Sequence, residues 1–126
     1  MKQISIYLNF IKEKGRSLSE INPGSDEIAL TVDDALYALD LLDASHIAVL
    51  GGDILSEKEN GEFIYAYQFW GNGYEYHCLN WSCSRVDNES QEDYVKRSYI
   101  IAKENIKTAS DTAKRLGKKC YIVIVI

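Results

Sequence analysis

The amino-acid sequence predicts an α+β fold in which helices pack on a mixed four-stranded sheet. Apolar residues recur every three or four positions in residues 3–14 and again in residues 90–116, which is the spacing of amphipathic helices. Aromatic side chains alternate with other residues over residues 62–70, which is the period of a strand. Residues 120–126 form an almost continuous apolar run that would aggregate if exposed, so we expect an interior strand there.

The first third of the chain predicts two helices separated by a loop. The helix over residues 3–14 is followed by a loop over residues 17–26, which contains the only proline. Thr31 and Asp34 then have the spacing of a capping box, in which the hydroxyl accepts a hydrogen bond from a first-turn amide. The second helix begins there and is expected to end at about Ala44.

Residues 46–56 are the stretch around which we expect the rest of the chain to be arranged. The apolar run at residues 47–50 predicts a strand that is covered on both faces. Gly51 and Gly52 then remove two side chains, which indicates a bulge, a bend or a second backbone that passes close by. Asp53 follows at once. It is either a solvated or turn-bonded residue beside a structural bulge, or part of a polar site.

Two short turns after this strand predict a meander of three antiparallel strands. Asn60 and Gly61 provide the pair of left-handed residues that a tight hairpin needs. The second strand then covers residues 62–70, and a glycine-rich turn leads into a third strand over residues 74–84.

The long helix and the last strand complete the predicted sheet. Ser90 and Asp93 have capping-box spacing, and the apolar stripe continues to Leu116. At roughly 40 Å this helix is longer than a strand, so it either overhangs the sheet or breaks near residues 108–110. The helical crossover makes the last strand parallel to the first and third. We expect it beside the first, which gives the strand order 4-1-2-3.

Length and composition predict a single soluble domain over residues 1–126. No apolar run approaches the roughly 20 residues that span a bilayer, and no export signal is visible, so we expect no membrane association. The three cysteines are an odd number, which favours free thiols in a reducing compartment. These features predict a cytoplasmic protein.

Charge is distributed unevenly along the chain. The formal net charge is −5, but residues 17–57 contain nine acidic residues and neither lysine nor arginine. Residues 96–126 contain eight basic and two acidic residues. The acidic body argues against binding to nucleic acid, whose phosphates need a basic surface, and it suits a basic protein partner. A merely solvated acidic face is the alternative.

Residues that carry catalysis or bind metals do not occur in a recognised pattern. His77 and Cys78 are adjacent, and neighbouring residues of a strand point apart, so they do not form a nucleophile–base pair. The histidines and cysteines lack metal-ligand spacing, and no nucleotide-binding fingerprint occurs. We therefore expect no enzymatic activity, no metal and no cofactor. The alternative is a small metal-dependent enzyme that uses Asp53.

Aromatic residues of the predicted meander are candidates for contact with a protein partner, because Tyr and Trp are enriched at the energetic centres of such interfaces. If helices cover only one face of the sheet, four tyrosines line the open face and two tryptophans lie near strand ends. The alternative is that this face is core beneath the long helix. The six residues are Tyr65, Tyr67, Tyr74, Tyr76, Trp70 and Trp81.

A series of short motifs runs through most of the chain, from Ser17 to about Lys107. They are Ser-Leu-Ser-Glu-Ile-Asn at 17–22, Glu-Ile-Ala-Leu at 27–30 before an Asp-Asp-Ala helix, Val-Leu-Gly-Gly-Asp-Ile at 49–54, the Asn-Gly hairpin at 60–61, Asn-Trp at 80–81, and Asn-Glu-Ser at 88–90 before a helix with Tyr-Val at 94–95 and Arg-Ser at 97–98. In this order and spacing they resemble the immunity protein 40 family of bacterial polymorphic toxin systems. The resemblance implies a small, cytoplasmic α+β inhibitor that binds and neutralises a cognate toxin. It implies no catalytic residues.

We therefore predict an immunity protein that binds a basic cognate toxin by protein–protein contact, either as a monomer or as a homodimer. A structural module that dimerises through its aromatic face is a further alternative. The expected partner-binding residues combine aspartates of the acidic stretch with the aromatic face. They are Asp33, Asp40, Asp43, Asp53, Tyr65, Tyr67, Trp70, Tyr74, Tyr76 and Trp81.

Overall fold

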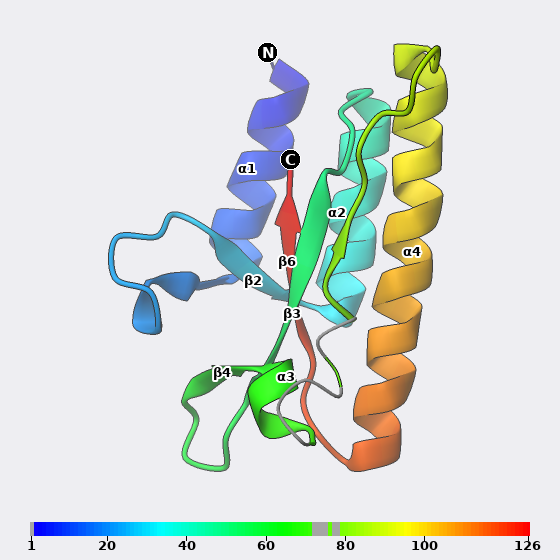
Figure 1. Cartoon of the computed structure of the whole chain (residues 1–126). Coiled ribbons are helices and arrows are strands. Elements are labelled where there is room, and N and C mark those ends of the chain that lie inside the picture. Colours follow the sequence, from blue (N-terminus) through cyan, green and yellow to red (C-terminus); the bar gives the residue numbers. More distant parts are fainter. Residues whose placement is uncertain (1, 72–75, 77–78) are drawn as a thin grey trace.

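The computed structural model describes residues 2–71, 76 and 79–126, and over this range long helices cover one face of a twisted sheet (Figure 1). The helices are α1 (Lys2–Lys14), α2 (Val32–Ala44), α3 (Ala66–Phe69) and α4 (Gln91–Leu116), with a 3₁₀ turn at Leu18–Glu20. The strands are β1 (Arg16–Ser17), β2 (Ile28–Thr31), β3 (Gly51–Glu57), β4 (Phe63–Tyr65), β5 (Trp81–Ser82) and β6 (Tyr121–Val125).

β6 lies at the centre of the sheet, although it follows every other element along the chain (Figure 1). The strand order is β1-β2-β6-β3-β4, and β5 pairs with the beginning of β3. Ile122 of β6 lies opposite Leu30 of β2 on one side and Ile54 of β3 on the other. The α+β prediction is confirmed, and so is the prediction that the last apolar run forms an interior strand.

The predicted four-stranded mixed sheet is wrong in number, direction and order. Over the described residues the sheet has six strands, and each of its pairings is antiparallel. The third strand of the predicted meander is β5, which pairs with β3 and not with β4. β5 and β6 are both antiparallel to β3, so they run parallel to each other. α4 is the crossover that connects them. In the predicted order 4-1-2-3, the last strand lies beside the first, and the first beside the second. These two adjacencies are found, as β6 beside β3 and β3 beside β4.

The strand predicted over residues 62–70 ends with β4, where the chain turns into α3. The Trp70 amide donates a hydrogen bond to the Ala66 carbonyl over 2.8 Å, and both side chains are buried. Burial of this indole outweighs the alternating pattern, whose preference for a strand depends on packing against a pleated surface. Residues 72–75 and 77–78, which belong to the predicted turn and third strand, lie outside the described residues.

β1 and β2 occupy a region for which the sequence predicts a loop over residues 17–26 and no strand. β1 pairs with β2 through Arg16 and Ala29. β2 has only four residues, and its two central residues, Ala29 and Leu30, are both buried. A strand covered on both faces shows no alternation of apolar and polar residues, and the apolar run of three residues at 28–30 is too short to indicate a buried strand.

The predicted helices are confirmed, including their caps. Thr31 Oγ1 accepts a hydrogen bond from the Asp34 amide (3.3 Å), and Ser90 Oγ accepts one from the Asp93 amide (3.1 Å). α4 continues without a break through residues 108–110, so the break considered there does not occur. Among the described residues, no helix combines the length and the apolar character needed to cross a bilayer.

The hairpin between β3 and β4 uses one left-handed residue where the sequence predicts two. Gly61 has a φ of +90°, whereas Asn60 has no positive φ. The Asn60 side-chain oxygen instead accepts a hydrogen bond from the Glu62 amide over 3.1 Å. The Lys58 amide donates to the Glu62 carbonyl (2.8 Å), so the loop is longer than the two-residue turn that was expected.

The double glycine allows β5 to approach β3 closely. A Cβ atom at Gly51 would lie 2.3 Å from the Trp81 carbonyl oxygen, and one at Gly52 would lie 2.2 Å from the Trp81 ring. Both contacts are far shorter than any real Cβ contact, so neither position accepts a side chain without movement of β5. Of the interpretations of the two glycines, the close approach of a second backbone is confirmed.

The two faces of the sheet bury different cores. On the helix side, Ile54, Ile122 and Leu30 pack beneath α1, α2 and α4 in one large cluster. On the opposite side, Leu55 and Val123 belong to a much smaller cluster, which is covered by the 3₁₀ turn through its buried residue Leu18. This second face is therefore only partly covered, and it leaves side chains such as those of Tyr65 and Tyr121 partly exposed.

Candidate partner-binding site

The partly covered face of the sheet carries two acidic side chains, one on β3 and one immediately before β2, and β6 lies between these two strands. Asp53 of β3 lies opposite Val123 of β6, and Val123 lies opposite Ala29 of β2. Glu27 precedes Ala29 by two residues, so it points to the same face as Asp53. The charge of Asp53 accordingly contributes to a raised pKa of Glu27, after burial, which is the larger cause.

Two tyrosines lie beside these carboxylates. Tyr65 lies opposite Leu55, two residues beyond Asp53 on the same face. The rings of Tyr65 and Tyr67 stack with centroids 5.9 Å apart and planes inclined by 29°. Glu27, Asp53, Tyr65 and Tyr67 are all half-buried. We call these four residues the carboxylate–tyrosine face.

Neither acidic group of the carboxylate–tyrosine face forms an ion pair with a cation of the described residues. Burial raises the pKa of Asp53, and it raises the pKa of Tyr65 with smaller contributions from Asp53 and Glu27. Within the part of the chain that the structure describes, no lysine, arginine or histidine forms an ion pair with either carboxylate. A half-buried carboxylate without a counter-ion is costly, and its pKa rises because the charged form is disfavoured.

The nearest built ion-pair network belongs to a different carboxylate. Arg16 pairs with Glu20 (2.7 Å) and with Glu57, and its guanidinium lies 3.8 Å from the centre of the Phe63 ring. Lys119 binds the second oxygen of Glu57 at 2.7 Å. These partners, Lys119 first, lower the pKa of Glu57. The same sheet face therefore holds one carboxylate with cationic partners, that of Glu57, and two without such partners among the described residues, those of Asp53 and Glu27.

The unpaired state of Asp53 gives a prediction about stability. Asp53→Asn is expected to raise the free energy of unfolding at pH 7 by roughly 0.5–1 kcal/mol, as for other stabilising surface changes. Because the pKa of Asp53 is raised in the folded chain, the unfolded chain loses this proton at lower pH, and the ionised carboxylate costs stability at neutral pH.

The pH dependence distinguishes this explanation from a change in packing. The cost is complete above the raised pKa of the folded chain and absent below the ordinary pKa of about 3.9. Urea unfolding of both proteins should therefore show the gain at pH 7 and little of it at about pH 3.5. Asp87→Asn, at an exposed position, is the matched control and should change neither value. An equal gain at both pH values would contradict the prediction.

The other predicted aromatic residues lie elsewhere. Trp70 is 5% exposed and packs edge-on against Tyr76, with ring centroids 6.1 Å apart. Trp81 lies against Gly52 and contacts the large core. In the described part of the chain, neither indole N–H has a hydrogen-bond partner. Tyr74 lies outside the described residues. The structure thus groups only Tyr65 and Tyr67 with Asp53.

The predicted aspartates of α2 form a separate surface. Asp33, Asp40 and Asp43 are exposed and follow one stripe of the helix, away from the sheet. None of them forms an ion pair with a described residue. They are therefore on the helix side of the molecule, whereas Asp53 is on the other side.

Glu27 is a member of the site that the sequence does not reveal. Its side chain is placed on this face only by its position two residues before Ala29. The face of Ala29 is in turn known only from the pairing of β2 with β6. Groups of three or more His, Cys, Asp or Glu residues suited to a metal ion do not occur among the described residues. What the face offers is a pair of carboxylates between apolar and tyrosine side chains.

Comparison with known proteins identifies one family. A model of the family described as "Immunity protein 40" matches residues 17–126, which extend from Ser17 of β1 through β6 and leave α1 and Arg16 outside the match. Comparison with curated proteins and with solved structures gave no significant match. Because the match extends over most of the chain, this protein belongs to the Immunity protein 40 family.

Proposed function

We propose that this immunity protein neutralises a cognate bacterial toxin by binding it through the carboxylate–tyrosine face. The observation that carries the proposal is the pair of half-buried carboxylates, Asp53 and Glu27, which form no ion pair with any described residue and are disfavoured in their charged form by burial. Such a pair costs stability in the free chain, and a partner that supplies the missing cation removes that cost on binding.

The chemistry of the face defines the partner. Two neighbouring carboxylates on a partly dry surface match an arginine or lysine side chain, and a guanidinium forms two hydrogen bonds with them. Tyr65 and Tyr67 add rigid, amphipathic rings beside that point, as in the energetic centres of other interfaces. The toxin is therefore expected to insert a basic side chain, and to cover the tyrosines around it.

The charge of the chain supports the same partner. Residues 17–57 carry nine acidic residues and no lysine or arginine. A negative field of this kind accelerates association with a basic protein, and the acceleration weakens as salt is added. We place this inhibition in the cytoplasm of the cell that makes both proteins.

The test uses the toxin encoded beside the gene for this chain. Cells that express the toxin domain should survive only when this protein is co-expressed, and the two purified proteins should form a complex measurable by calorimetry. Tyr67→Ala is expected to weaken the complex by about 2 kcal/mol, roughly thirtyfold, if the tyrosines are energetic centres.

Tyr37→Ala is the matched control for this substitution. Tyr37 is a 54% exposed tyrosine on α2, and its ring contacts Phe10 with centroids 4.9 Å apart. Its loss should leave toxin affinity unchanged. An equal loss of affinity for both variants, or survival of cells without this protein, would overturn the proposal.

A further inference from the structure

β4 ends the sheet on one side, so one of its edges has no neighbouring strand among the described residues. The Lys58 amide donates to the Glu62 carbonyl over 2.8 Å, which makes these two residues a hydrogen-bonded pair of the β3–β4 ladder. Such pairs alternate with non-bonded pairs along an antiparallel ladder, so the next bonded residue of β4 is Ile64. The main-chain groups of Phe63 and Tyr65 therefore point away from β3, toward the free edge.

These outward groups are available to a partner. In the part of the chain that the structure describes, no hydrogen bond involves the N–H or C=O group of Phe63 or the N–H group of Tyr65. An extended chain satisfies a row of such groups, because it offers N–H and C=O groups at the same spacing. The edge therefore selects a strand as its occupant.

A groove of about 280 Å³ lies along this edge. All three residues of β4 line it, together with Ile21, Lys58 and Gln68. Successive residues of a strand point to opposite faces, so a cavity that contacts all three lies beside the strand and not over one face. The groove is smaller than the roughly 300–1,000 Å³ of small-molecule sites, so it suits a segment of polypeptide.

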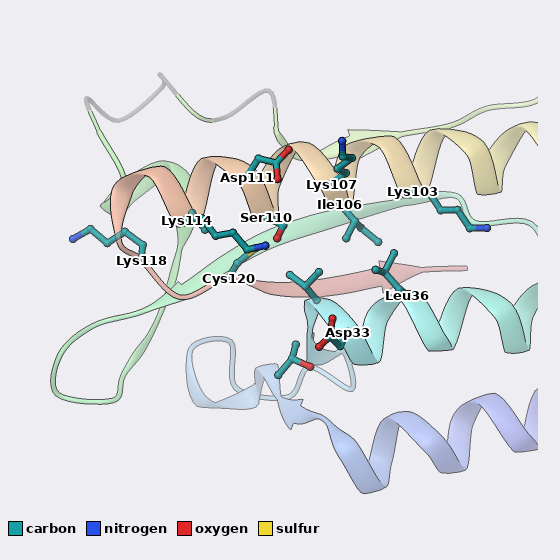
Figure 2. A pocket seen from close by; sticks show the side chains of 13 residues that line it. Asp33, Leu36, Lys103, Ile106, Lys107, Ser110, Asp111, Lys114, Lys118 and Cys120 are labelled. Atoms are coloured by element: carbon teal, nitrogen blue, oxygen red, sulfur yellow. The ribbon is translucent and has the colours of Figure 1, made fainter.

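A larger groove, of about 740 Å³, lies between α2 and α4 but does not define its occupant (Figure 2). Asp33 and Asp111 line it as well as Lys103, Lys107 and Lys114, so both signs of charge are present. The groove beside β4 is more selective, because the spacing and direction of its main-chain groups limit what can fill it.

Tyr65 connects the groove beside β4 to the carboxylate–tyrosine face. It lines the groove, and it lies opposite Leu55, two residues beyond Asp53. Neighbouring strands are about 4.8 Å apart, so a strand added to β4 would run about 10 Å from β3. An occupant of this edge is thus adjacent to the surface that the proposed function uses.

Charge favours the toxin over a second copy of this chain at the edge. In an antiparallel pair of two β4 strands, directly opposite residues share a face, so both carboxylate–tyrosine faces would lie on one side of the joined sheet. Glu27 and Asp53 of the two copies would then add like charge to one surface, which is unfavourable. A basic toxin brings the opposite charge to the same surface.

We infer that the toxin adds an extended segment to the free edge of β4 and so extends the sheet by one strand. The inference rests on the proposed function, because its occupant is the toxin, and it names the main-chain contact through which the toxin binds. In this mode main-chain hydrogen bonds supply affinity, and the side chains beside them supply specificity. Ile21, Tyr65 and Gln68 are the side chains that contact the added segment.

Proline at residue 65 tests the edge directly. Tyr65 has a φ of −66°, close to the value that a proline ring fixes, and its N–H group is not used in the β3–β4 ladder. Tyr65→Pro and Tyr65→Ala both remove the aromatic ring, but only proline removes the outward N–H group. In calorimetry with a catalytically inactive toxin, Tyr65→Pro should bind at least about 10-fold more weakly than Tyr65→Ala, because a toxin carbonyl loses its donor.

Ser17 provides the matched control at the opposite edge of the sheet. Its φ is −63°, and the bond from the Leu18 amide to the Glu27 carbonyl implies that the N–H group of Ser17 points away from β2. Ser17→Pro and Ser17→Ala both remove the cap of the 3₁₀ turn, so they are compared with each other. They should bind the toxin equally, because β2, β6 and β3 separate this edge from β4.

Amide hydrogen exchange gives a second measurement that needs no substitution. In the free chain, the Phe63 and Tyr65 amides should exchange faster than the Ile64 amide, which is bonded within the ladder. Binding of the toxin should slow exchange at Phe63 and Tyr65 by at least about 10-fold and leave Ser17 unchanged. Urea unfolding shows whether each variant folds, and exchange in the wild type decides if Tyr65→Pro does not.

The outcomes separate this inference from the proposed function. Equal affinities of Tyr65→Pro and Tyr65→Ala, or unchanged exchange at Phe63 and Tyr65, would overturn the added strand, and loss of affinity in Tyr67→Ala would still support the carboxylate–tyrosine face. A similar loss in Ser17→Pro relative to Ser17→Ala would also contradict the inference. So would a wild type of twice 14.3 kDa that Tyr65→Pro returns to a single chain, because the occupant would then be a second copy.

Discussion

Replacing Asp53 with arginine is expected to weaken the complex with the toxin by roughly 100-fold or more and to abolish protection of the cell. In the proposed complex, a basic side chain of the toxin lies between Asp53 and Glu27. The new guanidinium would occupy that place, neutralise Glu27 and repel the incoming cation. Calorimetry with a catalytically inactive toxin measures the affinity, and survival of toxin-expressing cells measures protection.

The controls for this prediction separate binding from folding. Asp87→Arg makes the same change in charge at an exposed position and should bind as the wild type does. Urea unfolding of Asp53→Arg should remain cooperative, because the introduced arginine has Glu27 as a partner. Asp53→Glu should retain more affinity than Asp53→Asn, since charge and not shape is what the face supplies. Full affinity in Asp53→Arg would place the toxin on another surface.

Substitution of the double glycine is expected to have the largest effect on the fold. Gly51→Val should lower the free energy of unfolding by about 3 kcal/mol, at the upper end of the cost of overpacking. The added carbon would lie 2.3 Å from the Trp81 carbonyl oxygen and 3.1 Å from the Cα of Ser82, which are both backbone atoms. β5 would have to leave β3. Urea unfolding, followed by tryptophan fluorescence, measures the loss.

A second substitution distinguishes a clash with backbone from a clash with a side chain. At Gly52 the obstacle is the Trp81 ring, so Trp81→Ala should relieve much of the additional cost of Gly52→Ala. The same change should not rescue Gly51→Ala, where the obstacle is the carbonyl oxygen. Gly24→Ala meets no atom within 4 Å and should cost only the strain of its positive φ, about 1 kcal/mol. Equal rescue at both positions would contradict the geometry.

The helices were predictable because their signals are local. Thr31 and Ser90 cap α2 and α4 with hydroxyls that accept first-turn amides, and Gly117 ends α4 with a φ of +69°. These signals lie within a few residues of the helix ends that they specify. The body of each helix is indicated by apolar residues at spacings of three and four. This spacing is visible in the sequence because each helix buries only one stripe of its surface.

The sheet was less predictable because its pairings depend on distant residues. The alternation over residues 62–70 satisfies a strand, but burial of Trp70 against the large core selects a helical turn after Tyr65. β5 then runs antiparallel to β3 and pairs with its beginning, whereas the predicted third strand is parallel to the first. The parallel direction predicted for β6 is wrong for this reason.

The candidate site was half predictable. Asp53 is marked by the two glycines before it, and Tyr65 by its place in an alternating run. Glu27 has no local mark, since it precedes a four-residue strand without a period of its own. Its position beside Asp53 depends on β6, which lies between β2 and β3 and sets the distance between them.

The position of β6 also determines when the carboxylate–tyrosine face is assembled during synthesis of the chain. β6 leaves the ribosome after every other strand, yet it is the only described strand that joins β2 to β3. Until residues 121–125 have emerged from the exit tunnel, Glu27 and Asp53 belong to separate, unjoined segments. A nascent or prematurely terminated chain therefore has no assembled carboxylate–tyrosine face. The proposed inhibition therefore requires that β6 has been made and has joined the sheet.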